Sequence, residues 1–452
     1  MEEKAEGKRD GFTSKFGIIA AAAGSAIGLG NIWRFPYVVG ESGGGAFLLI
    51  YLSFVLLLGI PVMLSEFVIG RKARRNAYGS FKKIAPGTLW PVVGIMGIVA
   101  AFVILAFYST IAGWTLHYVY LSLVDGFAGK GTTDLTSMFE SFQASRFMPL
   151  FWQMLFILIT AFIILSGVKK GIEKYSKILM PFLVVLLLGL CIRSLTLPGS
   201  MQGLTFLFSP DFSQINAAVI LSALGQAAFS LSIGMGALIT YASYFPKNTN
   251  LANTAFEVSI ADVIIAILAG IAIFPAVFAL GMEPDSGVGL IFMVLPNVFL
   301  QIPGGYFVAL AFFVLLSIAA VTSSISIMEV VVAFVVEEFK VKRQHATIIT
   351  VVAAAFVGVF CTLSWSTFQE VTISEMSIFD TLDFAASNIL LPLGGLLIVV
   401  FVGWYMNNMQ VKEEMSNAGL LRLKFFMVFK FVVRFIAPIA IALVFLNGIG
   451  LF

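Results

Sequence analysis

Long apolar stretches alternate with short polar connections along the whole chain. About eleven of them reach the roughly 18 residues that an α-helix needs to cross the hydrocarbon core of a bilayer. The pattern predicts an all-α polytopic membrane protein with 11 transmembrane helices. We place the helices near residues 16–40, 45–70, 91–124, 149–167, 175–197, 216–243, 256–282, 304–338, 346–367, 380–408 and 425–450.

The composition excludes the common soluble classes. Of the 452 residues, 60% are hydrophobic and 11% are charged, whereas a soluble domain has about 45–50% apolar and about 25% charged residues. Disordered scaffolds and nucleic-acid-binding proteins need polar surface that this chain lacks, so we expect no nucleic acid as a partner. Cys191 and Cys361 lie inside apolar segments, which argues against a disulfide framework.

The distribution of lysine and arginine predicts the orientation in the membrane, because cytoplasmic loops are enriched in these residues. The N-terminal tail and every second connection after it hold nineteen of them, whereas the opposite connections hold three, Lys130, Arg146 and Arg193. We therefore expect residues 1–15 to form a cytoplasmic tail. With an odd number of spans, the C-terminus is expected on the extracellular or periplasmic side.

Two of the predicted helices carry glycine pairs halfway along an apolar run. The first contains GSAIGLGN (24–31) and the sixth contains SLSIGMGA (230–237), and both share the pattern I-G-(L/M)-G. Glycine in a helix interior costs roughly 1 kcal/mol relative to alanine, and non-helical backbone is tolerated at membrane depth only where protein or a cavity surrounds it. Matching breaks favour a central binding site, while the alternative is a small-residue surface for close helix packing.

The spacing of the two motifs predicts an internal repeat. The motifs lie 206 residues apart, and each opens a run of five spans. This is the pattern of a 5+5 inverted repeat with discontinuous helices 1 and 6. We expect a first repeat at 16–197 and a second at 216–408. The eleventh span, within 425–452, is then an extra C-terminal helix.

Four motifs resemble those of the neurotransmitter:sodium symporter family. They are GSAIGLGNIWRFP (24–36), SGGGAF (42–47), ITYASY (239–244) and AAVTSSISIME (319–329), and the resemblance extends from Arg9 to about residue 400. The chain is most similar to bacterial amino-acid transporters that end after eleven spans. The resemblance implies a sodium-coupled secondary active symporter of the bacterial inner membrane. With the pocket residues considered below, it implies import of hydrophobic L-amino acids, aliphatic and aromatic, by alternating access with two Na+ and without an obligatory protein partner. Transport is expected to be independent of chloride, for a reason given below for Asp262.

Two other functional classes fit the chain less well. In an ion channel the glycine breaks would form a continuous pore, which candidate gates on both faces argue against. An intramembrane metalloprotease or an ATP-driven pump would carry an HExxH motif or a phosphate-binding glycine loop, and the sequence has neither. We therefore expect a transporter and not an enzyme.

The resemblance implies a first sodium site at the helix breaks. Sodium prefers oxygen ligands, and unwound helix segments supply them as free carbonyls. By similarity, the site uses the Ala26 carbonyl, the Asn31 side chain, Ser230 and the position that we align with Asp262, completed by the substrate carboxylate.

Asp262 departs from the family pattern, because most relatives carry asparagine there. Chloride-dependent members bind an anion beside this sodium, and Tyr51, Gln226 and Ser230 match three of their chloride-binding positions. A fixed carboxylate at Asp262 would replace the anion, so we expect chloride independence, with proton counter-transport as an open alternative. The competing interpretation is an aspartate satisfied by hydrogen bonds alone, but an intramembrane carboxylate is a functional hypothesis by default.

A second sodium site and a gating motif are also implied by the resemblance. Serine and threonine hydroxyls in membrane helices often bond their own backbone, which is the competing interpretation of such a site. Gly171 and Pro181, spaced Gly-x9-Pro, match a motif linked to unwinding of the fifth helix, although a proline kink without gating is an alternative. The implied second-site ligands are the carbonyls of Gly24, Ile27 and Ala319 and the hydroxyls of Thr322 and Ser323, with Ser324 as an alternative.

The substrate pocket is expected between the two breaks, because half-helix N-termini present free N–H groups to a carboxylate. By similarity, the amides near Leu29 and Gly30 and the Tyr108 hydroxyl hold the carboxylate. Gly28 replaces the aspartate of monoamine carriers and so leaves room for the substrate's own carboxylate. The implied substrate-binding residues are Ala26, Gly28, Leu29, Gly30, Ile104, Tyr108, Phe229, Ser230, Ser232, Met235, Ser323 and Ile327.

Gates are implied on both sides of the pocket. Arg34 and Asp383 match the residues that the family pairs as an extracellular gate, with Tyr108 and Phe229 as the lid below them. On the cytoplasmic side, the implied gate consists of Arg9, Glu337, Phe12 and Tyr244. Glu66 and Glu329 are expected to be structural partners, and His117 and His345 show no metal-ligand spacing.

Overall fold

A computed structural model of the chain describes residues 11–279 and 290–451. In these two ranges the chain is predominantly helical, and the only sheet is a hairpin of β1 (Thr372–Ile373) and β2 (Met376–Ser377). Nine helical segments are long and apolar enough to cross a membrane, and a bent helix pair adds a tenth. The prediction of an all-α polytopic membrane protein is therefore confirmed.

The spanning segments follow the order predicted from hydropathy, and several contain a π-helical turn, labelled η. The sixth predicted span is divided into two helices that are each too short to cross a bilayer alone. The segments are α1 (Lys15–Ala26), η1 (Gly30–Arg34) and α2 (Phe35–Glu41); α3 (Gly45–Phe54), η2 (Val55–Gly59) and α4 (Ile60–Ala73); α6 (Pro91–Leu123); α8 (Met148–Leu165); η3 (Val168–Glu173) and α9 (Lys174–Leu195); α11 (Ala217–Ser230) and α12 (Ala237–Ala242); α13 (Leu251–Ala279); α15 (Gly305–Phe339); α16 (Arg343–Thr362) and the 3-10 helix η6 (Leu363–Trp365); α17 (Ile378–Phe384), η7 (Ala385–Leu390), α18 (Leu391–Val400) and η8 (Phe401–Tyr405); and α20 (Phe426–Phe431), η9 (Val432–Ile436) and α21 (Ala437–Gly448).

The connections also contain short helices that the hydropathy pattern does not predict. They cover the ends of the spanning helices and shorten the irregular loops. These helices are α5 (Ala77–Ile84), α7 (Thr132–Ala144), α10 (Ser200–Phe208), the 3-10 helix η4 (Phe212–Gln214), η5 (Leu290–Val294), α14 (Leu295–Gln301) and α19 (Asn408–Met415).

The seventh spanning helix, α13, begins at Leu251, five residues before the predicted start at 256. The reason is a polar helix cap. The Asn253 N–H donates a hydrogen bond to the Asn250 side-chain oxygen at 3.1 Å, and asparagine is a preferred cap because it satisfies such a free N–H. A polar first turn of this kind is invisible to a hydropathy window.

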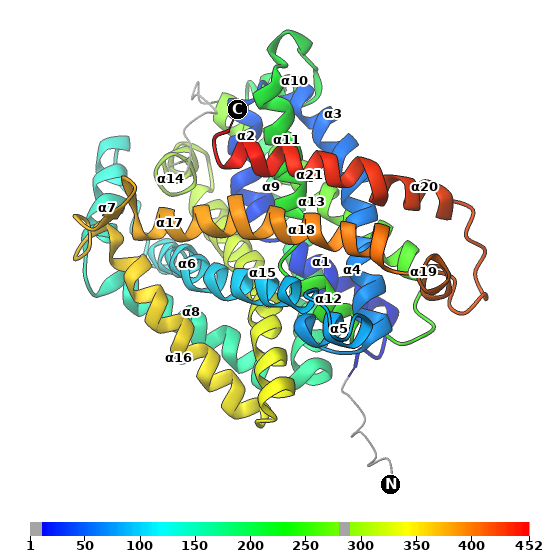
Figure 1. The fold of residues 1–452 in the computed structure, drawn as a ribbon. Helices are drawn as coiled ribbons and strands as arrows, with labels where there is room; N and C mark the ends of the chain where they lie inside the picture. Colours follow the sequence, from blue (N-terminus) through cyan, green and yellow to red (C-terminus); the bar gives the residue numbers. More distant parts are fainter. Residues whose placement is uncertain (1–10, 280–289, 452) are drawn as a thin grey trace.

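The interrupted segments lie in the interior of the helix bundle, where α1 and α12 appear in the centre of Figure 1. α1 packs against α9, α13 and α15, and its residues Ala20 to Ala23 are at most 4% exposed. A helix that is apolar and buried on all sides belongs to the core of a bundle. α18 and α21 pack side by side at the periphery, where apolar residues such as Ile439 are exposed, as expected for a surface that faces lipid.

Candidate functional site

The first helix is interrupted because the backbone leaves the helical path at Ile27, whose φ of −75° and ψ of 98° are extended. The second part, η1 with α2, is bent by 53° from α1. The Asn31 side chain bridges the gap, since its Oδ1 accepts a hydrogen bond from the Gly28 N–H at 3.2 Å. The first glycine motif therefore marks a break in the helix, as predicted.

The sixth helix breaks between α11 and α12. Ser232, Gly234 and Gly236 there have φ angles of +54°, +90° and +75°, a region that glycine adopts without steric cost. Glu66 of α4 accepts a hydrogen bond from the Gly234 N–H at 2.8 Å. A Cβ at Gly234 would lie 2.3 Å from the carbonyl oxygen of Leu391. Gly234 therefore fits both interpretations of the motif, because it allows the helix to break and it allows close packing against Leu391.

Hydrogen bonds join the two breaks to each other and to α15. The Ser232 hydroxyl donates to the Ser25 carbonyl oxygen at 2.9 Å, and the Ser323 hydroxyl donates to the same oxygen at 3.3 Å. The Ser25 hydroxyl in turn donates to the Ser326 hydroxyl at 2.8 Å. Three segments that are distant in sequence therefore meet at the centre of the bundle.

The residues expected around the first sodium site converge on the Asp262 carboxylate. The Asn31 Nδ2 donates to Asp262 Oδ1 at 2.7 Å, and the Ser230 hydroxyl donates to Oδ2 at 2.8 Å. The Tyr51 hydroxyl donates to Oδ2 at 3.2 Å. All four side chains are at most 1% exposed. These bonds offset the cost of burying a charged group, and we call these four residues the Asp262 cluster.

Two further residues expected at this site are Ala26 and Gln226. Ala26 is the last residue of α1 and is buried. Gln226, which the resemblance placed at the chloride position, donates instead from Nε2 to the Gly30 carbonyl oxygen at 3.1 Å. Tyr51 and Ser230 are thus in contact with the carboxylate, and Gln226 is bonded to the backbone of η1.

The residues expected at the second sodium site also lie together. A Cβ at Gly24 would be 3.3 Å from the Thr322 Cβ, so α1 and α15 are in contact at this point. The Thr322 hydroxyl donates to the carbonyls of Ile318 and Ala319, both at 3.1 Å, which is the backbone bonding expected for a helical threonine. Among the described residues, the buried Ser324 hydroxyl has no hydrogen-bond partner.

A cavity of about 440 Å3 leads to the expected substrate pocket. At one end it is lined by Leu29, Gly30, Tyr108 and Phe229, and the Tyr108 hydroxyl accepts a hydrogen bond from the Leu29 N–H at 3.2 Å. A Cβ at Gly28 would lie 3.1 Å from the Tyr108 hydroxyl. The remaining expected pocket residues are buried and do not line this cavity. They are Ala26, Gly28, Ile104, Ser230, Ser232, Met235, Ser323 and Ile327.

The expected outer gate residues line the same cavity but are not paired. Arg34 and Asp383 make no ion pair with each other in the described part of the chain. The Arg34 guanidinium instead lies 4.4 Å from the centre of the Phe229 ring, and Asp383 accepts a hydrogen bond from the Ser387 hydroxyl at 2.8 Å. The cavity therefore stays open between these two charges.

The expected inner gate is packed. The Phe12 N–H donates to the Tyr244 carbonyl at 3.2 Å, and the Tyr244 hydroxyl donates to Glu329 at 2.7 Å. Glu329 also forms an ion pair with Arg343, a residue that the sequence analysis does not single out. Arg9 lies outside the described residues. Its expected partner Glu337 accepts hydrogen bonds from the backbone and side chain of Asn76.

The Gly-x9-Pro segment holds a carboxylate that the sequence analysis also misses. Gly171 lies in η3, and a Cβ there would be 2.1 Å from the Ile163 carbonyl oxygen, while Pro181 lies inside α9. Glu173 accepts hydrogen bonds from the Thr13 N–H at 2.9 Å and from the Ser14 hydroxyl at 3.0 Å. η3 is therefore tied to the start of α1. No sequence signal indicates this contact, because the partners are 160 residues apart.

Comparisons with known proteins agree with this architecture. The model of the sodium:neurotransmitter symporter family matches residues 9–136 and 132–452, together nearly the whole chain. The chain belongs to the sodium:neurotransmitter symporter family. This symporter is 40% identical to an uncharacterized sodium-dependent transporter, YhdH, of Bacillus subtilis, over 97% of this chain and 98% of the relative. It is 26% identical to the sodium-dependent dopamine transporter of Bos taurus, over 90% and 65% of the two chains.

A solved structure resembles this symporter over almost its full length. It is the crystal structure of MhsT in complex with L-phenylalanine, with a TM-score of 0.90, 48% identity, and coverage of 98% of this chain and 100% of MhsT. The family and the apolar helices show a multi-pass membrane transporter that uses Na+ as its coupling ion and carries a small-molecule substrate.

Proposed function

We propose that this symporter imports hydrophobic L-amino acids, coupled to two Na+ and independent of chloride, by alternating access. The observation that carries the proposal is the buried Asp262 cluster, which puts a fixed carboxylate between the two helix breaks. A negative charge at this position supplies an oxygen ligand and a counter-charge for Na+. An additional anion is then not needed.

The substrate class rests on the space around Gly28. A side chain there would contact Tyr108 and Ser323, so only glycine leaves room for a substrate carboxylate beside the Leu29 amide and the Tyr108 hydroxyl. Apolar residues close by, Ile104, Met235 and Ile327, suit a hydrophobic side chain, and methionine adapts to different shapes. The 48% identical MhsT, whose crystal structure contains L-phenylalanine, supports an amino-acid substrate.

The second Na+ is proposed between α1 and α15. Gly24 and Ile27 supply carbonyls from the end of α1, and Ala319, Thr322 and Ser323 face them from α15 in the proposal. Ser324 is the alternative to Thr322, because its hydroxyl is buried and has no partner within the described ranges. The Gly171–Pro181 segment would open a path from this site to the cytoplasm when η3 separates from α1.

Two sodium ions supply enough free energy for accumulation. A charge that crosses about 100 mV gains about 2.3 kcal/mol, and a tenfold concentration gradient adds about 1.4 kcal/mol. Two ions then supply roughly 7 kcal/mol, which sustains an about 10⁵-fold gradient of a zwitterion at tight coupling. The proposed orientation places the N-terminus in the cytoplasm and Arg34 on the outside, with the two five-helix repeats at 16–197 and 216–408.

The proposal is tested by uptake of radiolabelled leucine and tryptophan into proteoliposomes. We expect both to accumulate with an inward sodium gradient, with potassium in place of sodium to give no accumulation, and with chloride omitted to give no change. Accumulation in potassium would contradict sodium coupling. If neither amino acid accumulates in sodium, the proposed substrate class is wrong.

Gly28→Asp tests where the substrate carboxylate lies. We expect leucine uptake to be lost, because the added carboxylate fills the space and repels the like charge of the substrate. Gly28→Ala is the control, because it adds a methyl group without a charge and so separates the steric effect from the charge effect. A substitution elsewhere, such as Gly189→Asp in α9, would not serve because it exposes a charge to lipid. Normal leucine uptake by Gly28→Asp would contradict the placement.

Asp262→Asn tests the anion argument. The side chain keeps its size but loses the negative charge, so we expect uptake either to become chloride-dependent or to fall sharply. The measurement is sodium-driven uptake with chloride and with gluconate as the only anion. Normal uptake by the variant in gluconate would show that the carboxylate does not replace an anion and is instead a hydrogen-bonded structural group.

A further inference from the structure

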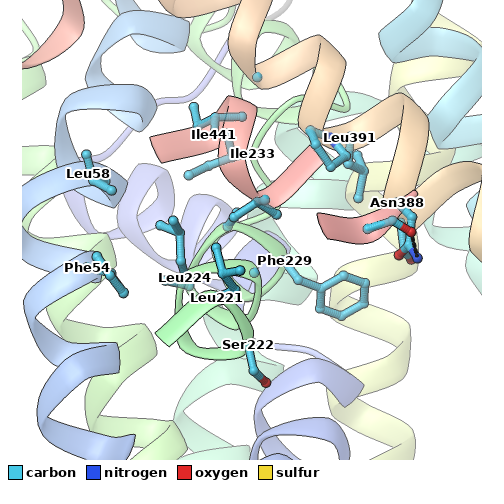
Figure 2. Close-up of a pocket in the computed structure, with 18 of the residues that line it drawn as sticks. Phe54, Leu58, Leu221, Ser222, Leu224, Phe229, Ile233, Asn388, Leu391 and Ile441 are labelled. Atoms are coloured by element: carbon cyan, nitrogen blue, oxygen red, sulfur yellow. Dashed lines mark hydrogen bonds between the residues drawn. The ribbon is translucent and has the colours of Figure 1, made fainter. Parts of the chain in front are cut away.

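A second cavity lies behind the outer lid and shares Arg34 and Phe229 with the substrate cavity described above. It has a volume of about 200 Å3 and lies between η2, α11, α18 and α21. Figure 2 shows Leu58, Leu224, Ile233, Leu391 and Ile441 arranged around this common space. These side chains come from four different spanning segments, and all five are buried. We call this space the lateral cavity.

The lateral cavity has a polar end and an apolar body. Asn388 and Asn447 line it near the end of α21, where the Asn388 Nδ2 donates to the Gly448 carbonyl at 3.0 Å. Arg34 lines it as well, and in the described ranges the guanidinium has neither a hydrogen bond nor an ion pair. Apolar cavities of this size tend to bind apolar guests, and the cation adds attraction for an anionic group.

The lateral cavity opens at the apolar surface of the bundle, because its lining residues Phe54, Leu221 and Val444 are themselves only partly buried. Leu57 and Ile220 stand next to lining residues of η2 and α11 and are 61% and 39% exposed. Leu443 of α21, next to the lining residue Val444, is 41% exposed. A hydrocarbon chain in the bilayer therefore reaches the cavity along apolar side chains without crossing water.

We propose that the lateral cavity binds a free fatty acid from the membrane, with its carboxylate on Arg34 and its alkyl chain among the aliphatic side chains. At about 200 Å3 the cavity is larger than an apolar cavity of about 150 Å3 that holds a benzene molecule, so it accommodates part of an alkyl chain. The rest of a longer chain extends between α11 and η2 to the bilayer. Such a ligand matches both the charge of the polar end and the chemistry of the body.

Binding there opposes closure of the outer gate. Arg34 and Phe229 line both the lateral cavity and the substrate cavity, so a carboxylate on Arg34 competes with Asp383 for the same guanidinium. The alkyl chain also packs behind Phe229. A bound fatty acid therefore holds the open arrangement and slows transport without occupying the substrate pocket. This consequence rests on the proposed function, whereas binding itself does not.

Photolabelling tests binding independently of transport. The full-length protein is reconstituted in vesicles of phosphatidylethanolamine and phosphatidylglycerol with a diazirine derivative of decanoate, and the labelled peptides are mapped by mass spectrometry. We expect labelling of η2, α11 and α21 at residues lining the lateral cavity. Gly225→Leu should lower it at least about tenfold, because a Cβ at Gly225 has room, 3.9 Å from Val444, and the added isobutyl group fills the cavity.

Gly189→Leu is the matched control, because this glycine lies in α9 with no neighbouring atom within 4 Å. We expect it to label as the unaltered protein does. If Gly225→Leu does not fold, Val444→Phe narrows the cavity from the opposite wall. Equal labelling of the filled and control variants would overturn the proposal, as would displacement of the label by excess leucine, which would assign the cavity to the substrate path.

Inhibition of uptake distinguishes the fatty acid from a general bilayer effect. We expect decanoate to lower the maximal rate of sodium-driven leucine uptake severalfold in the unaltered protein and in Gly189→Leu, but not in Gly225→Leu. Decanol, which lacks the charge, should have little effect. Equal inhibition by decanol and decanoate would overturn the role of Arg34. If the protein carries no leucine at all, the labelling result still decides whether the site exists.

Discussion

The two sides of the molecule use charged residues in opposite ways. On the side of the substrate cavity, Arg34 and Asp383 stand apart and line a space of about 440 Å3. On the side of the α1 N-terminus, Glu329 is paired with Arg343 and accepts a hydrogen bond from Tyr244. The difference indicates a state in which the cavity that leads to the substrate pocket is open on the Arg34 side, while the other side is sealed.

The number of contacts that must change also differs between the sides. In the proposed gating scheme, closing the Arg34 side requires one ion pair to form across the cavity, between Arg34 and Asp383. Opening the other side requires Glu173 to release Thr13 and Ser14, and a Cβ at Gly17 would lie only 2.4 Å from the Glu173 carboxylate oxygen, so the fit there is tight. We infer that the sealed side sets the larger barrier, and the following predictions test this comparison.

Asn31→Ala is expected to have the largest effect, because the Asn31 side chain lies at the proposed central ion site on which both sides of the molecule depend. The Asn31 side chain closes the first break and donates to Asp262. A lost hydrogen bond to a charged group costs about 1.5–3 kcal/mol, so we expect sodium-stimulated uptake to fall about 10- to 100-fold. The measurement is leucine uptake against sodium concentration, with size-exclusion chromatography to confirm folding. Unchanged sodium stimulation would show that this side chain is not part of the ion site.

Glu329→Gln is expected to weaken the sealed side. The substitution keeps the hydrogen bond from Tyr244 but removes the charge that pairs with Arg343, and breaking a buried pair is strongly destabilising for the arrangement that contains it. We expect the population to shift away from the state with the open substrate cavity. Reaction of a thiol reagent with Gln143→Cys, a residue that lines this cavity, should slow severalfold.

Two features make that experiment specific. The native Cys191 and Cys361 are buried, so the reagent reports on the introduced thiol. Glu257→Gln is the matched control, because Glu257 forms an ion pair with Lys15 whose side chains are 33% and 67% exposed, and solvent weakens such a pair relative to the buried one. A larger change in Glu257→Gln than in Glu329→Gln would contradict the view that the buried pair seals this side.

Hydropathy and glycine placement together predict the fold, because each depends on local chemistry. An apolar run that spans the membrane must be about as long as the bilayer is thick, so hydropathy detects it. Gly234 has a positive φ and no room for a Cβ, and the glycine at this position is itself a visible sequence signal. The start of α13 and the helices in the connections escape prediction, because they depend on single caps such as Asn250. The helices in the connections are also shorter than the roughly 18 residues that a hydropathy window for spanning helices detects.

The candidate site likewise contains residues that could be predicted from the sequence and residues that could not. The residues near the breaks, Asn31, Ser230 and Asp262, meet as the family resemblance implies. Glu173 and Arg343 bond to residues in other segments of the chain, and a single sequence does not predict such pairings. The separation of Arg34 from Asp383 escapes prediction for another reason, since whether two gate residues touch depends on the conformational state and not on the residue types.

Asp383→Asn is expected to have the smallest effect, and it examines the open side. The pair that Arg34 and Asp383 would form on closure is partly exposed, and such pairs are worth about 0–1 kcal/mol, so we expect the uptake rate to fall by no more than about fivefold. Asp380→Asn is the matched control, because Asp380 lines the same cavity but is bonded to Ser377 at the start of α17. A loss as large as that of Asn31→Ala would mean that closing the open side is the dominant barrier, which would reverse the comparison between the two sides.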